Sequence, residues 1–233
     1  MTDVQKPIGL VGGMSWESSA LYYRLLNEEA ARRLGGHHNA RSILYSVDYD
    51  DMLRWGTAGD WDAVADTLAE AARRLERAGA AIVLLAANSA HAVADRVQAA
   101  IGIPLLHIAD PVAKAAKNAG IARIGLLGTR FTMEMDFLAG RLRGHGLDVR
   151  IPEAGDRDRL HEIIVGELTL GDVRAESRAF LGDLIDRLAG QDAQGVVVGC
   201  TELPLLTAGA DFSLPAFDTA TLHVQAALDF ALA

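Results

Sequence analysis

Short apolar segments alternate with longer amphipathic ones along this chain, and that alternation restricts the fold more than any other feature. Residues 7–11 are apolar and end at Gly12-Gly13, after which residues 15–34 carry charges at helical spacing. Further strands are predicted over residues 42–47, 81–85 and 104–108, and helices over 61–78 and from about residue 89. Repeated strand-and-helix units predict an α/β fold with parallel sheets covered on both faces.

The second half of the chain echoes the first. Residues 124–129 (IGLLGT) resemble 8–13 (IGLVGG), and residues 196–201 (VVVGCT) resemble 83–88 (VLLAAN). We therefore predict two pseudo-symmetric parallel-sheet halves with the active site in the cleft between them, where open parallel sheets place their ligands. The first half is predicted to comprise residues 1–111 plus 214–233 and the second residues 112–213. A final helix is predicted over 219–232 and should pack on the first half.

Composition excludes several classes of partner. Acidic residues outnumber basic ones by 31 to 22, and a net charge of -9 repels nucleic acid. No apolar run reaches the roughly 18 residues of a membrane span, and the apolar start is too short for a secretory signal, so we expect a cytoplasmic protein. One cysteine excludes an intramolecular disulfide, and the adjacent His37-His38 pair lacks metal-ligand spacing, so no metal is predicted.

Cys200 is the strongest catalytic candidate. It follows an apolar strand at the start of Gly-Cys-Thr-Glu-Leu-Pro, a position that open α/β sheets expose to ligands. If a helix begins at Thr201, its backbone N–H groups favour the thiolate and lower the pKa of the thiol below about 8.5. The alternative is an inert buried thiol, because free cysteine is among the most buried residue types.

The matching turn of the first half carries Asn88 and Ser89. Their side chains suit a carboxylate or a developing enolate, although both residues also cap helices. His91 lies one turn later and is more often structural than catalytic in such a place. Met14 and Ser15 follow the Gly12-Gly13 turn, which either lets a ligand approach the backbone closely or is a tight turn only.

The second half offers a corresponding set of polar side chains. Thr129, Arg130 and Thr132 follow the strand at 124–127, where a guanidinium could bind a ligand's distal carboxylate; the alternative is a surface ion pair or a helix cap. Glu202 either receives a substrate ammonium group, orients Cys200, or merely complements a helix dipole.

Six short segments, taken together, resemble the aspartate/glutamate racemase family. They are residues 12–18 (GGMSWES) with Tyr22-Tyr23, 46–49 (SVDY), 88–91 (NSAH), 128–133 (GTRFTM) and 199–202 (GCTE). Their order and spacing match across almost the whole chain. The resemblance is greatest to the bacterial branch of broad-specificity amino-acid and Asp/Glu racemases.

This resemblance implies two flavodoxin-like halves, a homodimer, and an isomerase that needs no pyridoxal or other cofactor. Two residues flank the α-carbon of an amino-acid or dicarboxylate substrate, one removing the α-proton and the other returning a proton to the opposite face. The second of these positions falls on Cys200 and the first on Ala87. The implied substrate-binding residues are Met14, Ser15, Asn88, Ser89, Thr129, Arg130, Thr132, Thr201 and Glu202.

Ala87 departs from the family pattern, because a methyl group carries no exchangeable proton. Either the alanine is natural or it is an engineered replacement that leaves the neighbouring motifs intact. A natural alanine allows three outcomes: slow racemisation helped by Ser89 or a water, one-thiol decarboxylation or cis–trans isomerisation of a dicarboxylate, or ligand binding without turnover. Proton transfer at the α-carbon of an acidic amino acid is the leading hypothesis.

Overall fold

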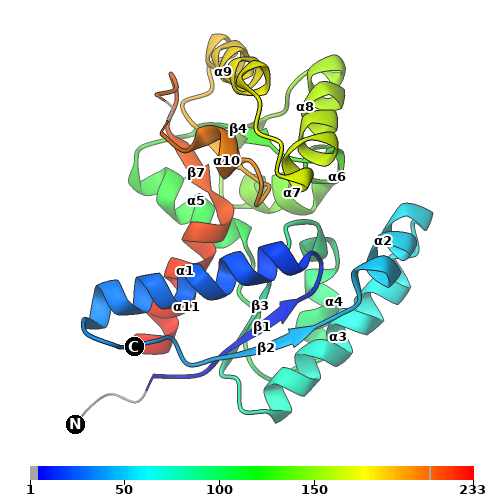
Figure 1. Ribbon diagram of the computed structural model, residues 1–233, viewed down its shortest axis with the longest axis vertical. Helices are drawn as coiled ribbons and strands as arrows, with labels where there is room; N and C mark the ends of the chain where they lie inside the picture. The colour runs from blue at the N-terminus through cyan, green and yellow to red at the C-terminus, as the bar shows by residue number, and fades with distance from the viewer. Residues whose placement is uncertain (1–4, 210) are drawn as a thin grey trace. The chain divides into compact units, whose positions relative to one another are not determined.

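The computed structural model describes residues 5–209 and 211–233, which divide into two compact units. The first unit runs to Ile108 and resumes at Ala220. Its elements, labelled in Figure 1, are β1 (Ile8–Gly12), α1 (Trp16–Leu34), β2 (Ser42–Ser46), α2 (Tyr49–Ala58), α3 (Trp61–Arg77), β3 (Ile82–Leu85), the 3-10 helix η1 (Ser89–Val93), α4 (Ala94–Ala99) and, nearly all in this unit, α11 (Thr219–Leu232).

The second unit spans Ala109–Thr219. Its elements are α5 (Ala109–Asn118), β4 (Arg123–Leu127), α6 (Arg130–Glu134), α7 (Asp136–Gly144), β5 (Asp148–Arg150), α8 (Ala154–Gly166), the 3-10 helix η2 (Leu168–Leu170), α9 (Ala175–Gly190), β6 (Val196–Val198), α10 (Pro204–Thr207) and β7 (Ala216–Asp218).

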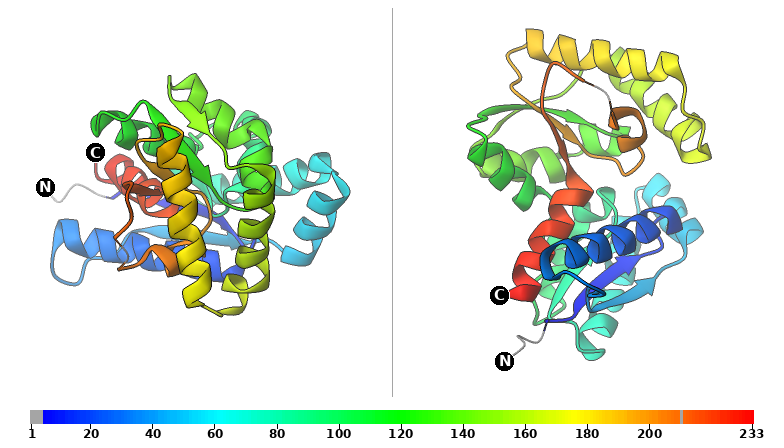
Figure 2. Two further views of the ribbon diagram at one scale, coloured as in Figure 1. Left: turned by 90° about the horizontal axis from the view of Figure 1, so that it is seen from above. Right: turned by 60° about the vertical axis from the view of Figure 1, so that its left-hand side comes forward.

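The sheet of the first unit is parallel, with strand order β2-β1-β3. Alternate residues of β1 face opposite sides, so Leu10 packs with α1 and α11 while Val11 packs with α3. Figures 1 and 2 show α1 and α11 together over one face of this sheet. The final helix thus joins the core of the first unit through Val224 and Leu228, both buried.

The sheet of the second unit is also parallel, in the order β5-β4-β6-β7. Leu127 and Val198 face α8 and α9 in one apolar cluster, in which Leu184 and Leu188 of α9 are fully buried. Helices α5 and α7 pack on each other, with Val112 and Leu142 buried. The predicted α/β fold with two parallel sheets is confirmed.

The two segments that echo each other in the sequence also pair in the same register in their two sheets. Gly9 lies beside Val83 and Val11 beside Leu85, and the residues that the echo makes equivalent are paired in the same way, Gly125 with Val196 and Leu127 with Val198. The backbone bonds just beyond the strands repeat as well, since Ala86 N–H donates to Val11 O at 2.9 Å and Gly199 N–H to Leu127 O at 2.7 Å. Each central strand therefore holds the end of its neighbour in the same place.

Two local predictions differ from the structure, and one further helix is present. The strand predicted over residues 104–108 is wrong: only one parallel bridge forms, between Leu105 and Val83, and the Leu106 carbonyl oxygen that a longer ladder would use instead lies 2.9 Å from His223 Nε2. The helix predicted from Ser89 begins as the 3-10 helix η1. Helix α2 was not predicted; the Asp48 carboxylate caps its start by accepting from Asp50 N–H at 2.9 Å.

The aromatic residues of α1 divide between core and surface. Tyr22 is fully buried, whereas the side chains of Trp16 and Tyr23 are 71% and 56% exposed. Their helical spacing favours the core or a subunit interface for all three, and the core of this unit takes only Tyr22.

Replacing Leu68 tests the apolar layer between α3 and the first sheet. Leu68 is fully buried, so Leu68→Ala removes packed methyl groups and should lower the free energy of unfolding by about 2–5 kcal/mol. Arg73→Ala on the exposed side of the same helix is the matched control, with an expected change below about 1 kcal/mol. Urea unfolding measures both, and equal losses would contradict this layer.

Candidate active site

Cys200 lies two residues beyond β6 and is buried against the α8 and α9 cluster. Gly199, just before it, donates its N–H to Leu127 O, and a Cβ on Gly199 would lie 2.8 Å from that oxygen. Glycine at residue 199 avoids that collision. The central strand β4 therefore positions the residue that carries the thiol.

The thiol of Cys200 has a carboxylate partner. Its Sγ donates to Glu202 Oε2 at 2.9 Å, and the hydroxyl of Thr201 donates to the same oxygen at 2.8 Å. Burial, and then the negative charge and hydrogen bond of Glu202, raise the pKa of Cys200 well above its ordinary value. At neutral pH this residue is a thiol, and Cys200, Thr201 and Glu202 form one bonded group.

The predicted lowering of the Cys200 pKa is wrong. No helix begins at Thr201, because Thr201–Leu203 form a turn and α10 starts at Pro204 and has only four residues. The backbone N–H groups of Glu202 and Leu203 do hydrogen-bond toward the sulfur and favour the thiolate. Burial and the Glu202 carboxylate outweigh them.

Ala87 occupies the equivalent place in the first unit. It lies two residues beyond β3, and its half-buried methyl group packs against the α3 cluster as Cys200 packs against that of α9. The Ala87 carbonyl oxygen lies 3.0 Å from Nδ1 of His91. The buried residue Asn88 precedes η1, but its side chain makes no cap hydrogen bond, and Ser89 begins that helix half-buried.

Met14 and Ser15 have structural tasks in the first unit. The Ser15 hydroxyl caps α1 by accepting from Ser18 N–H at 3.1 Å, and Met14 packs against the α3 cluster. Gly13 has a φ of 86°, and a Cβ there would collide with the Val47 carbonyl oxygen. The Gly-Gly turn is thus required by the neighbouring chain segment, whichever ligand binds nearby.

The second unit brings most of its predicted residues together. Thr132 is buried, its hydroxyl lies 3.4 Å from that of Thr129, and it donates to Gly199 O at 3.5 Å, next to Cys200. Arg130 instead extends to the surface, where its guanidinium donates to Asp158 at 2.8 Å. Carboxylate recognition by Arg130 stays a prediction that requires this exposed ion pair to exchange.

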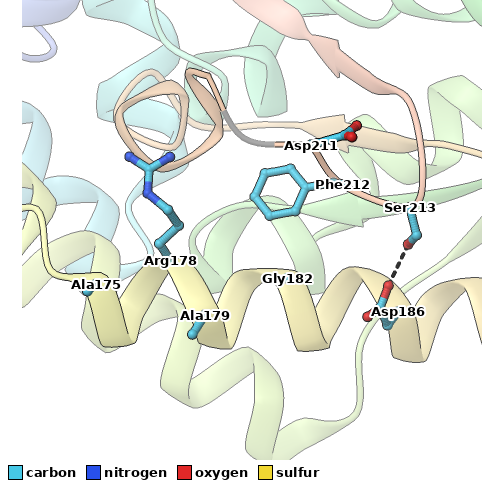
Figure 3. A pocket seen from close by; sticks show the side chains of 8 residues that line it. All are labelled: Ala175, Arg178, Ala179, Gly182, Asp186, Asp211, Phe212 and Ser213. Carbon is cyan, nitrogen blue, oxygen red and sulfur yellow. Dashed lines mark hydrogen bonds between the residues drawn. The ribbon is translucent and has the colours of Figure 1, made fainter.

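Two surface hollows lie apart from the predicted residues. One, of about 440 Å³, runs along α9, where Phe212 sits over Gly182 and Ser213 donates to Asp186 at 2.6 Å (Figure 3). The other, of about 480 Å³, is lined by residues 45–48 and by α3. Three residues of the 46–49 segment, Ser46, Val47 and Asp48, line the second hollow. In the sequence, only the family resemblance of that segment drew attention to this region.

In residues 5–209 and 211–233, no three His, Cys, Asp or Glu side chains are grouped to hold a metal ion. Within the same described ranges, no helix is both long and apolar enough to cross a membrane.

A known protein family matches nearly the whole chain. The family described as Asp/Glu/Hydantoin racemase matches residues 11–227. The chain belongs to this family. The matched span includes Ala87 and Cys200, the residues just beyond the two equivalent strands.

Individual relatives agree with the family assignment. The chain is 46% identical to a candidate Asp/Glu racemase from Yersinia pestis, with a TM-score of 0.93 and 98% and 100% of the two chains covered. It is 32% identical to an aspartate racemase homologue from Pyrococcus horikoshii, with a TM-score of 0.88 and coverage of 97% and 99%. It is also 20% identical to the broad specificity amino-acid racemase RacX of Bacillus subtilis, over 97% of this chain and 98% of that protein.

Replacing Glu202 tests its effect on the thiol. Glu202→Gln keeps the shape but removes the negative charge, so the pKa of Cys200 should fall, although burial still holds it above the ordinary value. The Cβ chemical shift of ¹³C-labelled cysteine, followed against pH, reports Cys200 alone because the chain has one cysteine. Glu176→Gln, on α9, is the control; an unchanged titration in Glu202→Gln would refute the electrostatic coupling.

Proposed function

We propose that this protein transfers a proton at the α-carbon of an acidic amino acid without a cofactor, with Cys200 as its acid/base residue. One observation supports this most directly: β3 pairs with β1 in the same register as β6 pairs with β4, so residues 87 and 200 are equivalent strand-end positions. These are the positions to which the family resemblance assigns the acid/base pair. Cys200 retains a thiol there, bonded to Glu202.

The Cys200–Glu202 group holds one dissociable proton between sulfur and carboxylate. When that proton moves to Glu202 or to solvent, the thiolate can remove the α-proton of the substrate and become a thiol again. Return of a solvent-derived proton from this thiol restores the amino acid. The cycle is balanced and leaves the substrate unchanged except that its α-hydrogen has exchanged with water.

The carbanion formed in this step needs hydrogen-bond donors, since the proposed reaction uses no cofactor to spread its charge. Asn88 and Ser89 in the first unit and Thr129 in the second are the candidate donors to the substrate's carboxylates. Thr132 and Thr201 can join them only by exchanging the hydrogen bonds that they donate to Gly199 O and Glu202. In this proposal Glu202 orients the thiol and sets its protonation rather than binding the substrate ammonium, because it already contacts Cys200 and Thr201.

Ala87 limits the reaction to one face of the substrate. With only Cys200 able to carry a proton, the enzyme should exchange the α-hydrogen mostly with retention of configuration, and inversion should be slow. Restoration of a proton carrier at residue 87 is therefore the main requirement for fast racemisation.

A second function is favoured by the protonation state of Cys200. A thiol whose pKa is raised stays protonated at neutral pH and can therefore give its proton to a strongly basic carbanion. Decarboxylation of a malonate-type dicarboxylate needs only one such proton, delivered to the carbanion left when carbon dioxide departs. This alternative requires no group at residue 87. It predicts release of carbon dioxide that Cys200→Ala abolishes.

Hydrogen exchange in heavy water tests the leading proposal. The protein incubated with each enantiomer of aspartate or glutamate should replace the α-hydrogen by deuterium, which proton NMR detects as loss of the α-signal. Cys200→Ala should abolish the exchange, whereas Glu176→Gln, at an exposed position on α9, serves as a folded control. Absence of exchange with every acidic amino acid would exclude this function.

Restoring the missing group tests the role of residue 87. Ala87→Cys, and to a smaller degree Ala87→Thr, should raise the racemisation rate by about 100-fold or more, since a positioned proton carrier typically contributes that much. Ala92→Cys on η1 supplies a thiol nearby but off the strand end, and should give no gain. Circular dichroism of the amino acid follows inversion; no gain in Ala87→Cys would show that residue 87 is not the second acid/base position.

A further inference from the structure

Three histidines and a tyrosine form a buried cluster inside the first unit. His91 comes from η1, His107 from the segment before α5, His223 from α11 and Tyr22 from α1, and none is more than 7% exposed. We call these four residues the histidine cluster. Imidazole is the side chain that changes charge near neutral pH. Because three imidazoles are buried together, the structure around them determines whether each can bind a proton.

The contacts of the cluster define its hydrogen positions. His91 Nδ1 lies 3.0 Å from Ala87 O, and His223 Nε2 lies 2.9 Å from Leu106 O. A carbonyl oxygen only accepts, so each of these nitrogens carries a hydrogen. In neutral His223 the other nitrogen, Nδ1, then accepts from the Tyr22 hydroxyl at 2.9 Å.

The same reasoning leaves Nε2 of His91 without a hydrogen. That nitrogen is buried and has no hydrogen-bond partner in the part of the chain that the structure describes. The His91 ring lies edge-on to those of His107 and His223, with ring centres 4.8 and 5.7 Å away. Protonation of His91 would therefore place a positive charge and an unsatisfied N–H among two further imidazoles.

No counter-charge awaits that proton among the described contacts of His91. Helix α3 packs on η1 with apolar residues such as Leu68, and the carboxylates of Asp62 and Asp66 pair instead with Arg96 at the surface. Burial first, and then His107 and His223, hold the pKa of His91 well below its usual value. The ring is thus kept neutral while it stays in place.

We propose that His91 is a positioning residue whose neutral form, donating from Nδ1 to Ala87 O, holds the strand-end loop 86–91, and that mild acid releases this loop. In an opened loop the His91 ring meets water and titrates near pH 6.5, about its free value. Below that pH the opened form binds a proton that the closed form excludes. The open population therefore rises by about tenfold for each pH unit, until the pKa of the closed form is reached.

The inference rests on the proposed function only where it concerns turnover. Residue 87 belongs to the held loop, so opening displaces the position to which an acid/base group is assigned. An Ala87→Cys enzyme should therefore lose racemisation below about pH 6.5 more steeply than the Cys200–Glu202 group alone dictates. The state of the His91 ring itself is independent of any substrate.

NMR of ¹⁵N-histidine-labelled protein tests the ring directly. At pH 7, His91 should show a protonated Nδ1 and an unprotonated Nε2. The opposite tautomer, or a charged ring at pH 7, would overturn the proposal. This measurement uses the unaltered chain and needs no variant to fold.

Amide hydrogen exchange tests the loop. Protection of amides 86–91, corrected for intrinsic rates, should fall about tenfold per pH unit below about pH 6.5. His91→Asn keeps a donor for Ala87 O but cannot titrate, so it should stay protected with little pH dependence, whereas His91→Phe should lose protection at every pH. His38→Gln, on an exposed loop, is the control. An undiminished pH dependence in His91→Asn would assign the effect elsewhere and refute the role of His91.

The two proposals fail separately. If the tautomer and protection results hold while no variant exchanges an α-hydrogen, the proposed function fails and the positioning role stands. If Ala87→Cys racemises but its activity and that of Ala87→Cys with His91→Asn have the same pH profile, the positioning role fails and the function stands.

Discussion

The two parallel sheets depend on the hydrogen bonds that each central strand makes beyond the end of its neighbour. Val11 O receives Ala86 N–H, and Leu127 O receives Gly199 N–H. Parallel pairing spaces these bonds evenly, so once the register of the strands is set, the next two residues are also positioned. Ala87 and Cys200 therefore hold equivalent places in their units because the backbone, and not their side chains, places them.

The two strand ends are held by different hydrogen bonds. In the second unit the thiol of Cys200 is hydrogen-bonded to the side-chain carboxylate of Glu202, two residues along the chain. In the first unit the carbonyl of Ala87 is bonded to the imidazole of His91, which belongs to a buried cluster. One support acts on the charge of the reactive group and the other on the position of the backbone. The halves therefore share a register but differ in the side chains that follow it.

The Cys200–Glu202 group shows which of two opposing electrostatic effects prevails at this site. Backbone N–H groups of the turn favour the thiolate, while burial and the carboxylate favour the thiol, and the second pair prevails. A thiol with a carboxylate neighbour is a proton store rather than a preformed nucleophile. That property suits a reaction in which a proton is taken from carbon and then given back.

The sequence by itself determined the α/β class, the internal duplication and the two strand-end positions, because period-2 and period-3.6 patterns and repeated segments are local properties. It also located Cys200 and the empty place at Ala87. Tertiary structure decided the rest. Whether Cys200 titrates low or high depends on burial and on where α10 begins, and the histidine cluster joins residues 22, 91, 107 and 223, which no spacing rule connects. Those outcomes depend on which surfaces the folded chain brings together and excludes from water.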